Sequence, residues 1–183
     1  MKFTKMEGAG NDYVYVDARN LDKDWNSLSR KISDRHFGVG ADGLILIMDS
    51  NVADLKMRMF NADGSEGAMC GNGLRCFAKY AIDRNIVNHK PSGITIETMS
   101  GIRTVIPRFD NGQITMAKVA MGQPELTPSK IPVHPETGLG ATLGKATVRY
   151  PITVDSVNLE LSFVSMGNPH AVAFIDQPVE TFP

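Results

Sequence analysis

The pattern of hydrophobic and polar positions is most regular between residues 74 and 82, where apolar side chains recur every three or four residues. Five of them follow the spacing i, i+3, i+4, i+7 and i+8 of one buried helix face: Leu74, Phe77, Ala78, Ala81 and Ile82. Cys76 and Tyr80 widen this face and leave only a narrow polar stripe. Because such a helix needs apolar neighbours on most sides, we expect it to lie at the centre of the fold.

Short runs rich in apolar, β-branched and aromatic residues predict strands on both sides of this helix. In the first 120 residues, these runs are 2–6, 13–17, 44–48, 57–60, 94–98, 102–106 and 114–119. A second helix is expected over 25–36, with Trp25, Leu28 and Ile32 on one face. Turn-forming residues separate the runs at 7–12, 61–65, 99–101 and 110–112. Many strands and few helices predict an α+β fold with a mostly antiparallel, curled sheet wrapped around the central helix.

Proline and glycine accumulate between residues 121 and 144, which indicates a domain boundary near residue 120. We therefore expect a first domain over 1–119, and a linker with an incomplete second domain over 120–183. Strands of the second part are predicted at 147–154, 159–165 and 171–176. A Gly-Asn pair precedes a strand at 10–11 and again at 167–168, a faint similarity that would fit two pseudo-symmetric domains facing each other across a cleft.

The charge balance is close to neutral, with 19 basic and 20 acidic residues, so it gives no electrostatic reason to expect a nucleic-acid partner. No apolar run approaches the length that spans a membrane, and the N-terminus lacks the apolar segment of a signal peptide. The two cysteines lie six residues apart around one helix start, which does not suggest a disulfide. These features predict a cytoplasmic protein without a membrane partner.

Cys70 stands where the central helix is expected to begin, beside Gly71 and Gly73. The first turn of a helix has N–H groups without intrahelical partners and a positive dipole end, so it binds anions and stabilises a thiolate. Glycines let a ligand approach these N–H groups closely. The segment therefore predicts a reactive thiol beside a carboxylate site, although a structural cysteine before a glycine-rich helix start would have the same sequence.

Five ordered blocks resemble the diaminopimelate epimerase family and cover nearly the whole chain. They are GAGND at 8–12, HFGVGADG at 36–43, FNADGS at 60–65, MCGNG at 69–73 and GNPH at 167–170. The resemblance implies epimerisation of LL-diaminopimelate to the meso form, without pyridoxal phosphate, another cofactor or a metal. It also implies two cysteines on opposite faces of the substrate, a homodimer at full length, and a role in lysine and peptidoglycan precursor synthesis.

The resemblance assigns roles to individual residues. Cys70 would be one catalytic acid/base, and the N–H groups of Gly71 and Asn72 would bind the α-carboxylate. Three asparagines would hold other polar groups of the substrate: Asn11, Asn61 and Asn168. His170 would be a second catalytic residue that tunes the ionisation of the cysteines. Taken without the family, Asn11 could equally be a turn residue and His170 a structural or solvated histidine.

The chain departs from the family pattern in two ways. Some members carry glutamine where Gly43 stands, so that substrate contact is absent or supplied otherwise. The family also continues past Pro183, and its second catalytic cysteine lies in that further part. Cys76 cannot replace it, because six residues along one helix place it about 9 Å from Cys70 on the same element. We therefore expect a truncated or cleaved epimerase that is inactive alone.

The sequence leaves four alternatives to weigh. A proline racemase-like enzyme is disfavoured because such members usually carry histidine where Asn72 stands, whereas a phenazine-type isomerase of the same fold stays open. A non-catalytic ligand-binding fragment is the alternative of another class. A zinc site is disfavoured because the candidate ligands lack the spacing of a closed site: Cys70, Cys76, His36 and His170.

Overall fold

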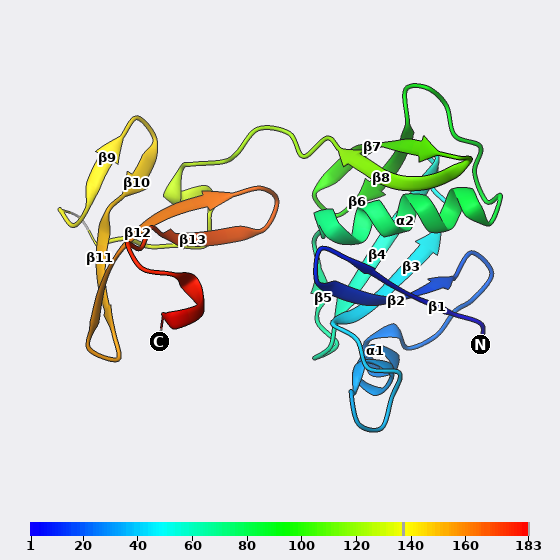
Figure 1. Ribbon diagram of the computed structural model, residues 1–183, viewed down its shortest axis with the longest axis horizontal. Coiled ribbons are helices and arrows are strands. Elements are labelled where there is room, and N and C mark those ends of the chain that lie inside the picture. The colour runs from blue at the N-terminus through cyan, green and yellow to red at the C-terminus, as the bar shows by residue number, and fades with distance from the viewer. Residues whose placement is uncertain (137, 183) are drawn as a thin grey trace. The chain divides into compact units, whose positions relative to one another are not determined.

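The computed structural model describes residues 1–136 and 138–182 (Figure 1). The chain divides into two compact units, Met1–Met121 and Gly122–Pro183. The elements of the first unit are, in order, β1 (Thr4–Gly8), β2 (Asn11–Asp17), α1 (Trp25–Ser33), β3 (Gly43–Met48), β4 (Leu55–Asn61), β5 (Glu66–Gly67), α2 (Gly71–Asp83), β6 (Ile94–Thr98), β7 (Gly101–Asp110) and β8 (Gln113–Val119).

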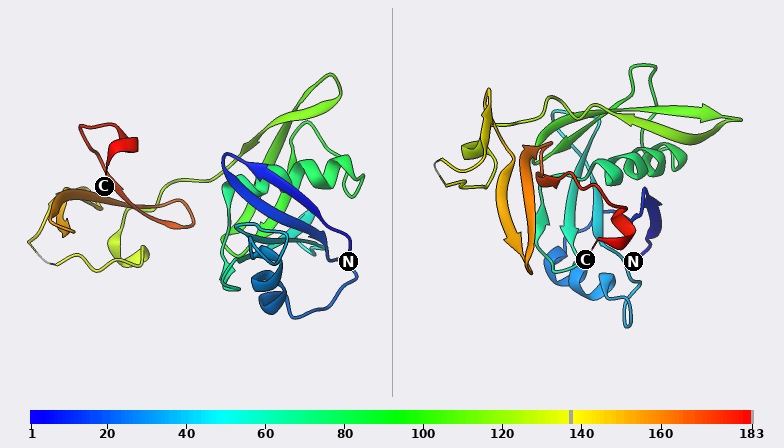
Figure 2. Two further views of the ribbon diagram at one scale, coloured as in Figure 1. Left: turned by 60° about the horizontal axis from the view of Figure 1, so that its bottom comes forward. Right: turned by 60° about the vertical axis from the view of Figure 1, so that its left-hand side comes forward.

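The first unit is one mixed sheet that curls around α2 (Figures 1 and 2). Its strand order is β1-β2-β3-β4-β6-β7-β8, with β5 paired to β4. The pairs β2–β3 and β4–β6 are parallel, and the other pairs are antiparallel. The predicted α+β fold with a mostly antiparallel, curled sheet around a central helix is therefore confirmed.

Two apolar clusters lie on opposite faces of the sheet. Tyr13 and Tyr15 of β2 face α2, whereas Val14 and Val16 face α1. The alternation continues in β3, so the central strands are buried on both sides, which explains the continuous apolar run at 44–48. The predicted buried face of α2 is confirmed at its centre, where Phe77 has no exposed surface.

The helix α1 ends three residues earlier than predicted. It stops at Ser33 because the Asp34 carboxylate accepts hydrogen bonds from the N–H groups of His36 and Phe37, both at 2.7 Å. These bonds form a local turn that competes with the helix. Gly38 then packs against the end of α1 so closely that a Cβ would lie 2.3 Å from the Lys31 carbonyl oxygen.

The β1–β2 turn is shorter than predicted. It consists of Ala9 and Gly10, whose φ angles are 53° and 87°, the geometry of a two-residue hairpin turn. Gly8 therefore pairs directly with Asn11 across the hairpin. The interpretation of Asn11 as a turn residue is wrong, because Asn11 is the first residue of β2.

The second unit consists of small antiparallel sheets. Its elements are η1 (Pro128–Lys130), β9 (Ala141–Leu143), β10 (Ala146–Val148), β11 (Tyr150–Val154), β12 (Val157–Ser165), β13 (Pro169–Ala173) and η2 (Val179–Thr181). β9 pairs with β10, and β11, β12 and β13 form a second sheet. No helix in the described part of the chain is long and apolar enough to cross a lipid bilayer.

Two predicted strands of the second unit are corrected. The strand expected over 147–154 is divided between β10 and β11, because Arg149 has a φ of 52° and breaks the extended backbone. The strand expected over 171–176 lies earlier, because Pro169 already pairs with Ser165 across a tight turn. The turn contains Gly167 at a φ of 101°.

The central position of α2 predicts that replacing two phenylalanines, one buried and one exposed, changes the free energy of unfolding by very different amounts. Phe77→Ala should lower the free energy of unfolding by about 3–5 kcal/mol, because it leaves a cavity in a closed core. Phe37→Ala is the control: this side chain is 95% exposed, so a change within about 0.5 kcal/mol is expected. Urea unfolding of both variants measures the difference, and equal losses would show that α2 is not the centre of the core.

Candidate active site

The candidate site starts from Cys70, which is the N-cap of α2. Its backbone is extended, with φ −133° and ψ 115°, and its Sγ accepts a hydrogen bond from the Gly73 N–H at 3.3 Å. The Cys70 carbonyl oxygen accepts the Leu74 N–H at 2.9 Å, which is the first bond of the helix ladder. The sulfur thus takes the place of the hydroxyl or carboxylate oxygen usual at an N-cap.

Glycine at position 73 permits the helix to begin so close to the sheet. A Cβ on Gly73 would lie 2.6 Å from Cδ1 of Ile45 in β3 and 3.6 Å from the Cys70 sulfur. Gly71 and Asn72 occupy the first two positions of α2, where N–H groups have no intrahelical partner. The helix start therefore provides N–H donors and a positive dipole end beside one sulfur, which suits a carboxylate.

Tyr13 is a neighbour of Cys70 that the sequence did not identify. Its side chain is 6% exposed and faces α2 from β2. Burial raises the pKa of the Tyr13 hydroxyl, and the neighbouring Cys70 raises that pKa further. The hydroxyl is thus protonated at neutral pH. The sequence signal that could have identified Tyr13 is its alternation with Tyr15 along β2, which places both side chains on the face that packs against α2.

A chain of hydrogen bonds joins the start of α2 to the β1–β2 hairpin. The Asn72 side-chain amide donates to the Asn11 side-chain oxygen at 2.7 Å, and the Asn11 amide donates to the Asp42 carboxylate at 3.2 Å. The Arg75 guanidinium donates to the Asn72 side-chain oxygen from the same helix. These bonds fix the direction of both asparagine amides, so the structure brings together Asn11, Asn72 and Cys70.

Asp42, which accepts the hydrogen bond from Asn11, belongs to a cluster of ion pairs. Arg35 donates two hydrogen bonds to Asp12, at 3.1 and 2.8 Å, and one to Asp42, at 2.8 Å. Lys5 pairs with Asp12 at 3.0 Å. The hydrogen bonds from Arg35 hold the pKa of the Asp12 carboxyl well below its usual range, and Lys5 lowers it further. The sequence gave no sign of this cluster, because its members are far apart along the chain.

Asn61 lies at the end of β4, directly opposite Gly43 of β3. Its amide donates to the Ser65 hydroxyl at 2.9 Å, within the turn that follows the strand. Gly43 has no room for a side chain, since a Cβ would lie 2.1 Å from the Phe60 carbonyl oxygen. With this backbone, the glutamine that some members carry at this position does not fit.

Asn168 and His170 belong to the second unit, where they contact each other. The His170 Nε2 lies 3.1 Å from the Asn168 side-chain oxygen, and both residues are exposed. His170 is on β13, opposite Val164 of β12. The structure therefore groups the predicted site residues into a helix-start set in the first unit (Cys70, Gly71, Asn72 and Asn11), Asn61 within its own turn, and an Asn168–His170 pair.

Cys76 differs from Cys70 in burial and in hydrogen bonding. It is 8% exposed, and its thiol donates to the Glu7 carbonyl oxygen at 3.3 Å. Burial raises the pKa of the Cys76 thiol, which opposes the thiolate form. Both cysteines are free of disulfide bonds. Cys76 is thus a packed side chain beside β1, in agreement with the sequence expectation.

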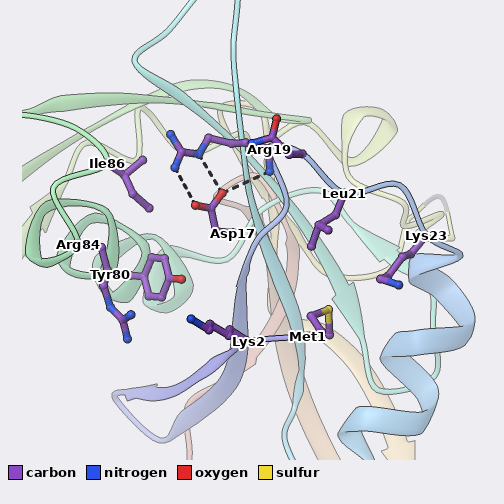
Figure 3. A pocket seen from close by; sticks show the side chains of 10 residues that line it. Met1, Lys2, Asp17, Arg19, Leu21, Lys23, Tyr80, Arg84 and Ile86 are labelled. Carbon is purple, nitrogen blue, oxygen red and sulfur yellow. Dashed lines mark hydrogen bonds and ion pairs between the residues drawn. The ribbon is translucent and has the colours of Figure 1, made fainter.

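A cavity of about 700 Å³ lies near the C-terminal end of α2 (Figure 3). Tyr80 and Arg84 of the helix line it, together with the Asp17–Arg19 ion pair, whose closest atoms are 2.7 Å apart. None of the predicted site residues lines this cavity. Within residues 1–136 and 138–182, no three His, Cys, Asp or Glu side chains are grouped so that they could hold a metal ion.

The Asp12 cluster predicts a stability loss that depends on pH. Asp12→Asn should lower the free energy of unfolding by about 1 kcal/mol at pH 6, where the native ion pairs are intact. Because the native pKa lies below the unfolded value of about 3.9, this contribution exists above pH 4 and is lost as the pH falls toward the native pKa. Urea titrations at pH 6, 4 and 3 should show the difference from wild type shrinking.

The exposed Asp22 provides the control for this experiment, since the described residues give it neither an ion pair nor a hydrogen bond. Asp22→Asn should have little effect at any of these pH values. A difference between wild type and Asp12→Asn that stays constant down to pH 3 would contradict the role of the Asp12 charge.

The chain was compared with known proteins. The sequence model of the family described as diaminopimelate epimerase matches residues 3–127. A diaminopimelate epimerase from Desulfovibrio desulfuricans is 49% identical, over 96% of this chain and 60% of the relative. One from Methanococcus maripaludis is 46% identical, over 100% of this chain and 63% of the relative. The chain thus spans about three fifths of the length of these relatives.

A solved structure supports the fold assignment. The crystal structure of a hydroxyproline epimerase from Agrobacterium vitis matches with a TM-score of 0.65, over 93% of this chain and 50% of that chain. Its sequence identity is 12%, so the likeness concerns the fold alone. The fold, the family match over residues 3–127 and the two curated relatives agree. The chain belongs to the diaminopimelate epimerase family.

Proposed function

We propose that this chain contributes one half of the active site of a cofactor-independent epimerase that converts LL-diaminopimelate to the meso form. The observation that carries the proposal is the position of Cys70, whose sulfur caps α2 beside the N–H groups of Gly71 and Asn72. Membership of the family and the two curated relatives named as diaminopimelate epimerases support the choice of substrate.

Cys70 acts as an acid/base at the α-carbon of the substrate. As a thiolate it removes the α-proton from one face and becomes a thiol, and a thiol on the opposite face returns a proton to the carbon. A base at this step must contact the proton and be close to its working ionisation. Each turnover thus moves one proton onto Cys70 and takes one from its partner, so the opposite direction uses the same two groups.

The start of α2 stabilises the negative charge that develops during this transfer. The carboxylate of the substrate accepts hydrogen bonds from the Gly71 and Asn72 N–H groups, where the helix dipole also favours an anion. These donors are fixed before the substrate arrives, so they need no reorganisation in the transition state. The bonds of Asn72 with Asn11 and Arg75 keep that end of the helix in place.

Cys76 is not the partner of Cys70. Its thiol is bonded to the Glu7 carbonyl, it is buried, and it lies on the same helix rather than across a substrate. Residues 1–183 contain two cysteines, so the acid/base of the opposite face is not a cysteine among these residues. The proposed roles of Asn168 and His170, substrate binding and tuning of the ionisation of the cysteines, rest on the family resemblance.

The two cysteines give a matched test of the assignment. In an active epimerase that carries these residues, Cys70→Ala should lower kcat by at least about 1000-fold, because it removes the acid/base of one face. Cys76→Ala should keep most of the turnover and lower stability modestly, as expected for a small buried side chain. Conversion of LL- to meso-diaminopimelate is the measurement, and near wild-type turnover of Cys70→Ala would refute the assignment.

A second test uses the 183-residue chain by itself. With Cys70 as its one suitable thiol, the chain should produce no meso-diaminopimelate at a rate close to that of an active relative. The experiment incubates the chain with LL-diaminopimelate in heavy water and follows both meso product and deuterium at the α-carbon. The Desulfovibrio desulfuricans relative is the positive control, and Cys70→Ala the negative one. Rapid meso formation would place a second acid/base within these residues.

A further inference from the structure

The chain of hydrogen bonds at the start of α2 has a carboxylate at one end and a guanidinium at the other. Asp42, directly before β3, accepts from the Asn11 amide of β2 at 3.2 Å. The Asn11 oxygen accepts from the Asn72 amide of α2 at 2.7 Å. The Asn72 oxygen accepts from Arg75, which lies further along the same helix. Side chains thus join two neighbouring strands of the sheet to the first turn of the helix.

The two ends decide how the amides between them are oriented. The oxygen and the nitrogen of an asparagine amide have nearly the same size and shape, so the group fits in either of two orientations. A carboxylate only accepts hydrogen bonds, and a guanidinium only donates them. Asp42 therefore takes an N–H of Asn11, whose oxygen then faces Asn72. Asn72 must donate from its nitrogen, which turns its oxygen toward Arg75. Reversing either amide would set two donors or two acceptors against each other.

We propose that Asp42 and Arg75 are positioning residues, which together impose one orientation on the side-chain amides of Asn11 and Asn72. This inference rests on the proposed function, in which the start of α2 binds the substrate. Within the described residues, each amide uses one N–H and one oxygen lone pair in the chain and keeps a second of each. The imposed orientation thus decides where a substrate meets a donor and where it meets an acceptor.

Asp42 is held in place by further hydrogen bonds. Its Oδ1 accepts from Arg35 at 2.8 Å, and its Oδ2 accepts from the Asp12 backbone N–H at 3.1 Å in addition to the Asn11 amide. The Asp42 N–H donates to the Asp12 carbonyl oxygen at 2.7 Å. The parallel pairing of β2 with β3 brings the two aspartates side by side. The carboxylate therefore cannot turn away from Asn11 without losing other hydrogen bonds.

Arg75 reaches Asn72 along one face of α2. The two residues are three positions apart, and side chains at this spacing are neighbours on a helix surface. The next cation of the same polar stripe is Lys79, which pairs with Asp83 at 2.9 Å instead. Arg75 is therefore the cation that ends the chain, and Lys79 offers a matched control on the same helix.

The experiment uses the isotope-labelled 183-residue chain and measures by NMR the hydrogen-exchange rates of the Asn11 and Asn72 side-chain amides. Arg75→Lys keeps a donor at the end of the chain, and Arg75→Glu replaces it with an acceptor. Lys79→Glu makes the same change of charge one turn later, where it does not touch the chain. Asp42→Asn keeps an oxygen that can face Asn11, and Asp42→Ala removes the acceptor. Each folded variant is then titrated with LL-diaminopimelate.

Arg75→Glu places the two amides between two acceptors, so one junction of the chain must be mismatched. The N–H that Asn72 donates to Asn11 should then exchange roughly fivefold faster, and binding of LL-diaminopimelate should weaken roughly tenfold. Arg75→Lys and Lys79→Glu should stay within about twofold of wild type in both measurements. Asp42→Ala should speed exchange at Asn11, and Asp42→Asn should restore slow exchange.

Unchanged exchange in both Arg75→Glu and Asp42→Ala would overturn the role of the two positioning residues, and Arg75→Glu alone decides if Asp42→Ala does not fold. Equal acceleration in Arg75→Glu and Lys79→Glu would overturn it as well, because charge alone would then be the cause. Normal binding by Arg75→Glu despite faster exchange would show that the orientation does not serve the substrate. A wild-type chain that binds no LL-diaminopimelate, while exchange follows the expected pattern, would refute the proposed function and still support the imposed orientation.

Discussion

The enclosure of α2 by the curled sheet is the constraint on which the rest of the first unit depends. The helix has almost no polar face, so it is stable only with sheet on most of its sides. That enclosure fixes where its first turn lies, between the β1–β2 hairpin and β3. The apolar face of the helix around Leu74 and Phe77 must be buried against the sheet. This burial fixes the positions of Cys70, Gly71 and Asn72 at the start of the helix.

The helix and its cysteine could be predicted because both follow from local rules. Apolar residues spaced at 3.6 residues per turn define the buried face, and Cys70 followed by Gly71 marks the start. The partners of that start could not be predicted in the same way. Asn11 and Asn72 are 61 residues apart, and the hydrogen bond from Tyr15 to the Gly73 carbonyl depends on the register of β2 against α2. Periodicity shows which face is buried, but not which residue of another element lies opposite.

The errors in the predicted strands and helices have local backbone causes. Ala9 and Arg149 both adopt positive φ angles, a conformation that propensity does not assign to these residue types. A two-residue turn at Ala9 and Gly10 shifted the first strand of the hairpin and lengthened the second, and Arg149 divided one strand into two. The early end of α1 came from the Asp34 carboxylate bonding to N–H groups ahead of it. In each case one residue changed the path without disturbing the core.

The two cysteines lie six positions apart on one helix, and this spacing gives them different surroundings. At about 100° per residue, six steps turn Cys76 well away from the direction of Cys70 and carry it about 9 Å along the axis. Cys70 lies at the helix end where N–H groups have no intrahelical partner. Cys76 packs against β1, where its thiol donates a hydrogen bond to the Glu7 carbonyl oxygen. Because one straight helix cannot present two side chains to opposite faces of a single carbon, the proposed mechanism takes one acid/base from α2 and requires the other from a different element.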